Sequence, residues 1–238
     1  MIKRIRCLFV VTLIALLSPI AMADRHLEAG GYLSSNTVLD DSFAFFTQHK
    51  MVLNQWGVDL RAEVLDVKDT LHLLPLISYR YATSDGSPYI GGSEMGTTLN
   101  AHEVDAGLRG RVWFLPWMGG FAQLQTGITH VQMKGEIDNH GQTGMYNRYS
   151  GNTNEWNLGA TMGVEFRISP WQMERMGIKR FNFGGEIGVG FVKRTAANFT
   201  PTLEGGDDLS LPSVQTVDFG NLDLTGVVFQ LGMTISFL

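Results

Sequence analysis

Residues 227–237 decide the fold, because their sequence, VVFQLGMTISF, places a large apolar side chain at every second position. One set of alternate residues is apolar throughout and comprises Val227, Phe229, Leu231, Met233, Ile235 and Phe237. The other set is mostly small or polar and comprises Val228, Gln230, Gly232, Thr234 and Ser236. Successive side chains of a β-strand point to opposite faces, so this stretch predicts a strand with one apolar and one polar face.

Seven further stretches show the same alternation, so the whole chain is expected to be all-β. The pattern is strong in residues 104–114, 156–168 and 181–191, and weaker in residues 25–35, 54–65, 69–82 and 120–133. Each stretch is near or above the ~9–11 residues that cross a bilayer at a tilt. The connections are long and short in turn, at residues 36–53, 66–68, 83–101, 116–119, 134–154, 169–179 and 195–221. Such spacing predicts one antiparallel up-and-down transmembrane β-barrel of eight strands, with four long loops at one end.

Alternation alone does not say which face meets lipid, and a soluble barrel with its apolar face inward is the alternative. The polar faces carry charges of both signs among glycines, whereas the outside of a soluble barrel would be rich in Lys and Glu. Aromatic residues also fall at both strand ends. The expected outer girdle comprises Trp56, Tyr79, Tyr81, Trp156 and Phe191, and the inner girdle Phe114, Trp117, Phe166, Trp171, Phe181 and Phe237. Two girdles are expected where a barrel crosses the two membrane–water interfaces.

The N-terminus has the pattern of a secretory signal. Lys3, Arg4 and Arg6 precede an apolar run at residues 7–17, and the segment ends in Ala-Met-Ala at residues 21–23. The run is too short and too soon interrupted by Ser-Pro for a membrane-spanning helix, which needs about 20 apolar residues. We therefore expect cleavage after Ala23 and a mature barrel domain of residues 24–238.

The mature chain is acidic and has no cysteine. It keeps 15 basic and 23 acidic residues, a net charge of −8, because the signal contains three basic residues and the single cysteine, Cys7. We expect no nucleic-acid partner, no disulfide and no thiolate metal site.

Three segments resemble the strands of small outer-membrane barrels: residues 120–127 (GFAQLQTG), residues 158–168 (LGATMGVEFRI) and the closing strand at residues 231–237. The barrels concerned are those of outer membrane protein A, OmpX, OmpW and the neisserial opacity proteins. The resemblance implies a location in the outer membrane of a Gram-negative bacterium. It also implies a C-terminal signal for the barrel insertion machinery, comprising Phe229, Leu231, Met233, Ile235 and Phe237. The chain departs from the usual aromatic ending because Leu238 follows Phe237.

Ten charged residues lie on the predicted polar faces and are expected to form a network inside the barrel. They are Asp59, Arg61, Glu63, Arg80, Asp105, Arg109, Arg111, Glu165, Arg167 and Glu186. Every cation is arginine, whose planar fork can bridge two carboxylates and suits a buried pair better than an ammonium group.

Catalysis and metal binding find little support. No G-x-S-x-G motif is present, and the nearest candidate, His130 with Thr129 and Thr126, would need an unusual threonine nucleophile. His49, His102, His130 and His140 come from different segments. They lack the spacing of metal ligands. We therefore expect no catalytic site, no metal site and no cofactor.

Two functions remain open. The first is a monomeric structural or surface-interaction barrel, with a plugged lumen and polar loops that contact an extracellular ligand, lipid and lipopolysaccharide. Phe43, Phe45 and Phe46 would then be exposed for contact, or would fold back to cap the lumen. The second is a narrow channel for small or apolar molecules. Eight strands leave room only for side chains, which favours the plug. The channel nevertheless remains an alternative, because four glycines on the predicted lumen faces would thin the wall. They are Gly184, Gly188, Gly190 and Gly232.

Overall fold

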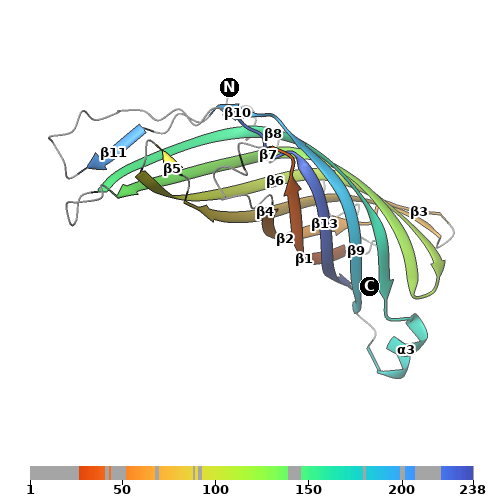
Figure 1. The fold of residues 1–238 in the computed structure, drawn as a ribbon. Coiled ribbons are helices and arrows are strands. Elements are labelled where there is room, and N and C mark those ends of the chain that lie inside the picture. The colour runs from red at the N-terminus through yellow and green to blue at the C-terminus, as the bar shows by residue number, and fades with distance from the viewer. Residues whose placement is uncertain are drawn as a thin grey trace.

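The computed structural model describes residues 27–40, 43, 52–67, 70–87, 89–90, 93–138, 146–178, 181–198, 202–206 and 221–237. Its main feature is a closed barrel of eight antiparallel strands (Figure 1). They are β1 (Leu27–Val38), β2 (Val52–Ala62), β4 (Leu71–Gly86), β6 (Ser93–Leu115), β7 (Met118–Asp138), β8 (Tyr146–Arg167), β9 (Phe181–Arg194) and β13 (Gly226–Phe237). Each pairs with the next along the chain, and β13 pairs with β1. The predicted all-β up-and-down barrel is confirmed, while the predicted signal segment lies outside the described residues.

Short strands and one short helix lie at the two ends of the barrel. At the inner end, β3 (Leu65–Val67) pairs with β4, and the helix α3 (Pro170–Arg175) joins β8 to β9 behind a capping box of Ser169 and Gln172. At the outer end, β5 (Tyr89–Ile90) pairs with β6 and β11 (Thr202–Gly206) pairs with β8. There β10 (Ala197–Asn198) also pairs with β12 (Asn221–Leu222). Within the described ranges no helix has the length and apolar character needed to cross a membrane.

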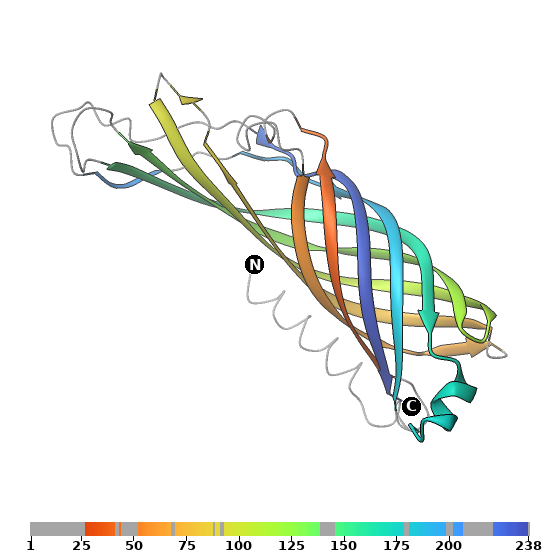
Figure 2. The same ribbon diagram turned by 60° about the horizontal axis from the view of Figure 1, so that its bottom comes forward.

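Three neighbouring strands are much longer than predicted. Strands β6, β7 and β8 contain 23, 21 and 22 residues, so much of the predicted loops at 83–101 and 134–154 is strand. Figures 1 and 2 show these strands and β11 projecting well past the outer ends of β1, β2 and β13. The predicted loop boundaries were wrong here, and the reason is a change in which face of the strands is apolar.

The two faces exchange polarity along β7 without any break in the pairing of its residues. Towards the inner end of the barrel, which we call its lower part, Leu124 is exposed and Gln125 is buried. Towards the outer end, its upper part, Val131 and Met133 are buried and Lys134 is exposed. The pairing of β7 with β8 runs from residue 118 to residue 138 without a register shift. The alternation therefore continues, but the apolar set moves from the outside to the inside, as expected where a sheet passes from lipid into water.

The inward-facing apolar residues of the upper part form a compact cluster, which we call the outer cap. It comprises Val38, Phe43, Leu53, Ala82, Met95, Leu99, Ala101, Val131, Met133, Tyr149, Leu222 and Leu224. The prediction that Phe43 is exposed for contact was wrong, since its side chain is fully buried here. Phe45 and Phe46 lie outside the described residues.

Candidate functional site

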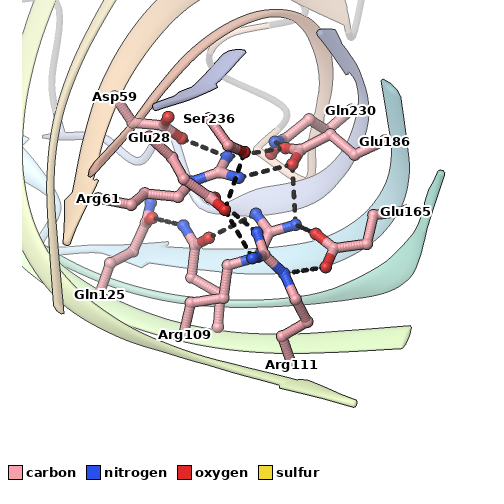
Figure 3. Close-up of polar contacts among 11 residues, drawn as sticks. Glu28, Asp59, Arg61, Arg109, Arg111, Gln125, Glu165, Glu186, Gln230 and Ser236 are labelled. Carbon is pink, nitrogen blue, oxygen red and sulfur yellow. Dashed lines mark hydrogen bonds and ion pairs between the residues drawn. The ribbon is translucent and has the colours of Figure 1, made fainter. Parts of the chain in front are cut away.

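The lower half of the barrel interior contains three arginines in contact with four carboxylates (Figure 3). Arg61 reaches both oxygens of Glu186, at 3.0 and 3.2 Å, and lies 2.6 Å from Asp59. Arg111 makes a two-pronged contact with Glu28 on the far strand β1, at 2.7 and 2.6 Å. Such bidentate pairs fix geometry as well as charge.

Arg109 lies at the centre of this group. Its Nη2 donates to Glu165 at 2.7 Å and to Glu186 at 2.8 Å, and its guanidinium lies 3.6 Å from the centroid of the Phe121 ring. Glu165 also contacts Arg111. Arg109 lies on β6, whereas Glu165 and Glu186 lie two and three strands further round the barrel wall on β8 and β9, so these contacts pass through the interior rather than between adjacent strands.

A second group lies above the first. Arg80 contacts both Glu103 and Asp105, and Arg194 donates to Glu103 at 2.6 Å. The other prong of Arg194 donates to the backbone carbonyl of Leu224, also at 2.6 Å. Leu224 belongs to the outer cap, so the upper ionic group ends directly beneath apolar side chains.

Two glutamines on β7 connect the groups. Arg109 approaches Gln123 at 3.4 Å, and Gln123 lies 2.6 Å from Gln125. Gln125 lies next to Asp105, at 3.4 Å. A continuous series of polar contacts thus runs along the interior from Glu28 near the inner mouth to the outer cap.

Most of the predicted network residues come together, and two do not. Eight of the ten take part in these contacts. Glu63 lies instead beside His72 in the β2–β4 connection. Arg167 lies at the inner mouth, where it donates to the carbonyl of Pro116 and stacks 3.9 Å over Trp113.

Sequence reasoning missed three members of the network: Glu28, Glu103 and Arg194. Glu28 lies in the glycine-rich first strand, where alternation is weak. The other two lie just beyond the predicted strand ends, in phase with Asp105 and Glu186. Extending those strands by the same alternation would have placed both residues inside the barrel.

The outer surface at the level of the ionic groups is apolar. Leu108, Leu124, Leu158, Met162, Ile187 and Leu231 are all exposed there. A closed barrel with buried charges and an exposed apolar belt is stable only when lipid surrounds it. The fold is that of a small outer-membrane β-barrel.

Aromatic residues border the apolar belt of the barrel. Trp56 packs against Tyr79 and Tyr81 with ring centroids 5.9 and 5.8 Å apart, and Trp156 is exposed further round on β8. At the inner end Phe114, Phe166, Phe181 and Phe237 are exposed. Trp117 lies in the β6–β7 turn and Trp171 in α3, so these two stand beyond the strands on which the other inner aromatics lie.

Solved outer-membrane barrels resemble the chain, at low identity. Neisserial surface protein A has a TM-score of 0.44 and 8% identity, over 90% of this chain and 96% of that one. The attachment invasion locus protein Ail of Yersinia pestis gives 0.39 and 14%, over 91% and 99%. A major outer membrane protein of Thermus thermophilus gives 0.45 and 14%, over 90% and 99%. No protein-family description and no curated protein sequence matches the chain.

The three residues of the predicted catalytic candidate do not come together in the barrel. Thr129 points inward and is fully buried, while His130 points outward, where its Nδ1 lies 2.9 Å from Asn154 Oδ1. Thr126 donates to the carbonyl of Asn157. His102 lies opposite His130 and contacts Tyr79 at 2.8 Å. His49 and His140 lie outside the described residues.

Arginine at Met162 is expected to destabilise the barrel by about 2–4 kcal/mol, because it places a charge in the middle of the lipid-facing belt. Met162 lies on β8 and is 64% exposed. Asn152→Arg is the matched control on the same strand, since Asn152 is exposed above the girdle. That change should cost about 0–1 kcal/mol. Urea unfolding in lipid vesicles measures both. Equal stability of the two variants would contradict the assignment of this face to lipid.

Proposed function

We propose that the protein is a closed, non-conducting outer-membrane scaffold that holds an extracellular sheet for contact with partners. Arg109 carries the proposal: it is 0% exposed and reaches from β6 through the lumen to Glu165 and Glu186, which are paired on the neighbouring strands β8 and β9. An eight-stranded barrel has an interior just wide enough for side chains, so such a bridge occupies the path that a solute would take.

The outer cap adds a second layer above the ionic groups. Leu53, Met95, Leu222 and Leu224 are each 0% exposed there. An ion that passed the charged layer would next meet packed hydrocarbon, where a bare charge is very costly. The two layers therefore oppose conduction for different physical reasons.

The lumen glycines favour the same function, because neighbouring side chains fill the space beside them. A Cβ on Gly232 would lie 2.9 Å from Cγ of Glu186, and one on Gly188 would lie 3.1 Å from Cζ of Phe121. A Cβ on Gly184 would lie 2.6 Å from Oγ1 of Thr234. These glycines thus make room for packed side chains rather than for a channel, which weighs against the narrow-channel alternative.

The surface offered to partners would be the outward face of the long strands β6, β7 and β8. Its side chains are polar, with charges of both signs, and include Thr98, Asn100, His102, His130, Gln132, Lys134, Glu136, Arg148, Asn152 and Asn154. We assign lipid and lipopolysaccharide headgroups to its lower edge near Tyr79 and Tyr81, and an extracellular ligand to the part above. The exposed alternate residues of β13, from Phe229 to Phe237, remain our proposed signal for the insertion machinery.

Purified protein in planar lipid bilayers is expected to show no steady conductance above that of the lipid. A water-filled porin reconstituted in the same way serves as the positive control, and protease protection of the barrel verifies insertion. Steady channels of reproducible size from the wild-type protein would overturn the plugged scaffold and favour the channel.

A further inference from the structure

A second cluster of polar side chains lies at the inner end of the barrel, apart from the lumen network. Glu63 follows β2, Asp66 is the middle residue of β3, and His72 lies on β4 directly opposite Asp66 in the pairing of the two strands. One potential ligand atom from each of the three residues lies within 4.8 Å of the other two. The fold therefore brings an imidazole and two carboxylates together from three consecutive segments of the chain.

His72 is the unusual member of the cluster. It is only 7% exposed, yet neither ring nitrogen makes a hydrogen bond to any residue that the structure describes. Buried polar groups are nearly always hydrogen-bonded, so two unsatisfied ring nitrogens need an explanation. Its Nδ1 lies 3.1 Å from Oε2 of Glu63 and 3.9 Å from Oδ1 of Asp66. The nitrogen is thus close to two carboxylate oxygens without donating to either.

These separations suit atoms that share a metal ion. Zinc binds histidine nitrogen and carboxylate oxygen at about 2.0–2.2 Å in tetrahedral geometry, which places neighbouring ligand atoms about 3.3–3.6 Å apart. The observed separations of 3.1 and 3.9 Å lie on either side of that range. An imidazolium that paired with these carboxylates would instead be expected to donate hydrogen bonds to them.

We propose that Glu63, Asp66 and His72 bind a divalent transition-metal cation of the Zn²⁺ class at the inner mouth of the barrel. The imidazole favours such ions over Ca²⁺ and Mg²⁺, which prefer oxygen ligands throughout. Three protein ligands leave a fourth position for water. The side chain of Asp66 is 35% exposed, and a cavity of about 330 Å³ borders all three residues, so the ion can reach the site from solvent.

The proposed ion would tie the β2–β4 connection to the barrel wall. Its ligands precede β3, lie on β3 and lie on β4, so binding would hold this short hairpin against the mouth. The same cavity is lined by Glu28 and Arg111 at the lower end of the lumen network. Because an ion that binds only the folded state stabilises it, metal should raise the midpoint of thermal unfolding.

The experiment uses the full mature protein, folded in detergent micelles and freed of metal with a chelator. Zn²⁺ is titrated calorimetrically, and Co²⁺ is titrated by visible absorption, which reports directly on nitrogen and oxygen coordination. We expect His72→Ala to remove one equivalent of bound metal and to abolish the zinc-dependent rise in unfolding temperature. Glu63→Gln should weaken binding by more than the roughly 10–100-fold that follows loss of an outer-shell partner.

His130→Ala is the matched control, because His130 lies on the outer surface at the opposite end with Asn154 as its partner. It should bind metal as the wild type does. Asp66→Asn keeps the shape of an exposed side chain and tests the site even if His72→Ala fails to fold, as judged by circular dichroism. Metal binding that survives both Glu63→Gln and Asp66→Asn, or that His130→Ala abolishes, would overturn the proposal, as would equal binding of Mg²⁺ and Zn²⁺.

Discussion

Replacement of Arg109 by alanine is expected to lower the free energy of unfolding by about 3–5 kcal/mol, the cost of removing one half of a buried ion pair. The expectation rests on the position of its two partners. Glu165 and Glu186 lie directly opposite each other on β8 and β9, and Arg109 is bonded to both. Without it the two carboxylates lie side by side in a narrow interior, where Glu165 keeps its contact with Arg111 and Glu186 keeps its contact with Arg61.

Urea unfolding in lipid vesicles, followed by tryptophan fluorescence, measures this effect. Arg167→Ala is the matched control, since Arg167 lies at the partly open mouth. Its loss should cost about 1 kcal/mol or less. The double variant Arg109→Ala with Glu165→Gln should be less unstable than the two single effects added together, because it also removes a stranded charge. A cost for Arg109→Ala as small as that of Arg167→Ala would mean that water fills the lumen.

Met133→Ala is expected to destabilise the protein by about 2–5 kcal/mol, as large-to-small changes in packed cores do. Met133 lies on β7 within the outer cap and is 1% exposed. The same unfolding measurement applies. The control is Lys134→Ala, one residue further on and on the exposed face. It should change stability by no more than about 0.5 kcal/mol. Equal effects at the two positions would mean that the upper sheet has no packed interior.

The lower part of the barrel could be predicted from the sequence, because one rule holds throughout it: apolar side chains point outward and polar side chains point inward. Leu158, Met162 and Leu231 alternate with polar residues, and lipid outside a narrow lumen gives both sets a defined place. The same alternation placed Arg109 and Glu165 on the inner face. Their actual partners depend on which strands lie across the lumen, and a single sequence does not contain that information.

The upper part of the barrel could not be predicted in the same way, because there the apolar side chains point inward and the polar side chains point outward. Leu99 and Ala101 point inward while Asn100 and His102 point outward, so a search for lipid-facing stripes ends the strand at this point. Phe43 is equally ambiguous, because an apolar residue in a polar segment fits both an exposed contact and a cap. The metal-site candidate combines residues whose proximity depends on the pairing of Asp66 with His72 across a short hairpin. The spacing of these residues in the sequence does not match a metal-binding motif.

The change of polarity along the long strands also sets the hydrophobic thickness of the bilayer that the protein can occupy. Trp156 and Phe166 border the apolar belt on β8 and lie ten residues apart. At a rise of about 3.3 Å per residue they are about 33 Å apart along the strand. A tilt of about 45° reduces this to a height of about 23 Å. That height matches the ~25 Å belt of outer-membrane barrels and falls short of the ~30 Å hydrocarbon core of a typical bilayer. Insertion into a thicker membrane would leave the strand ends mismatched, so the position at which the two faces exchange character favours the thinner bacterial outer membrane.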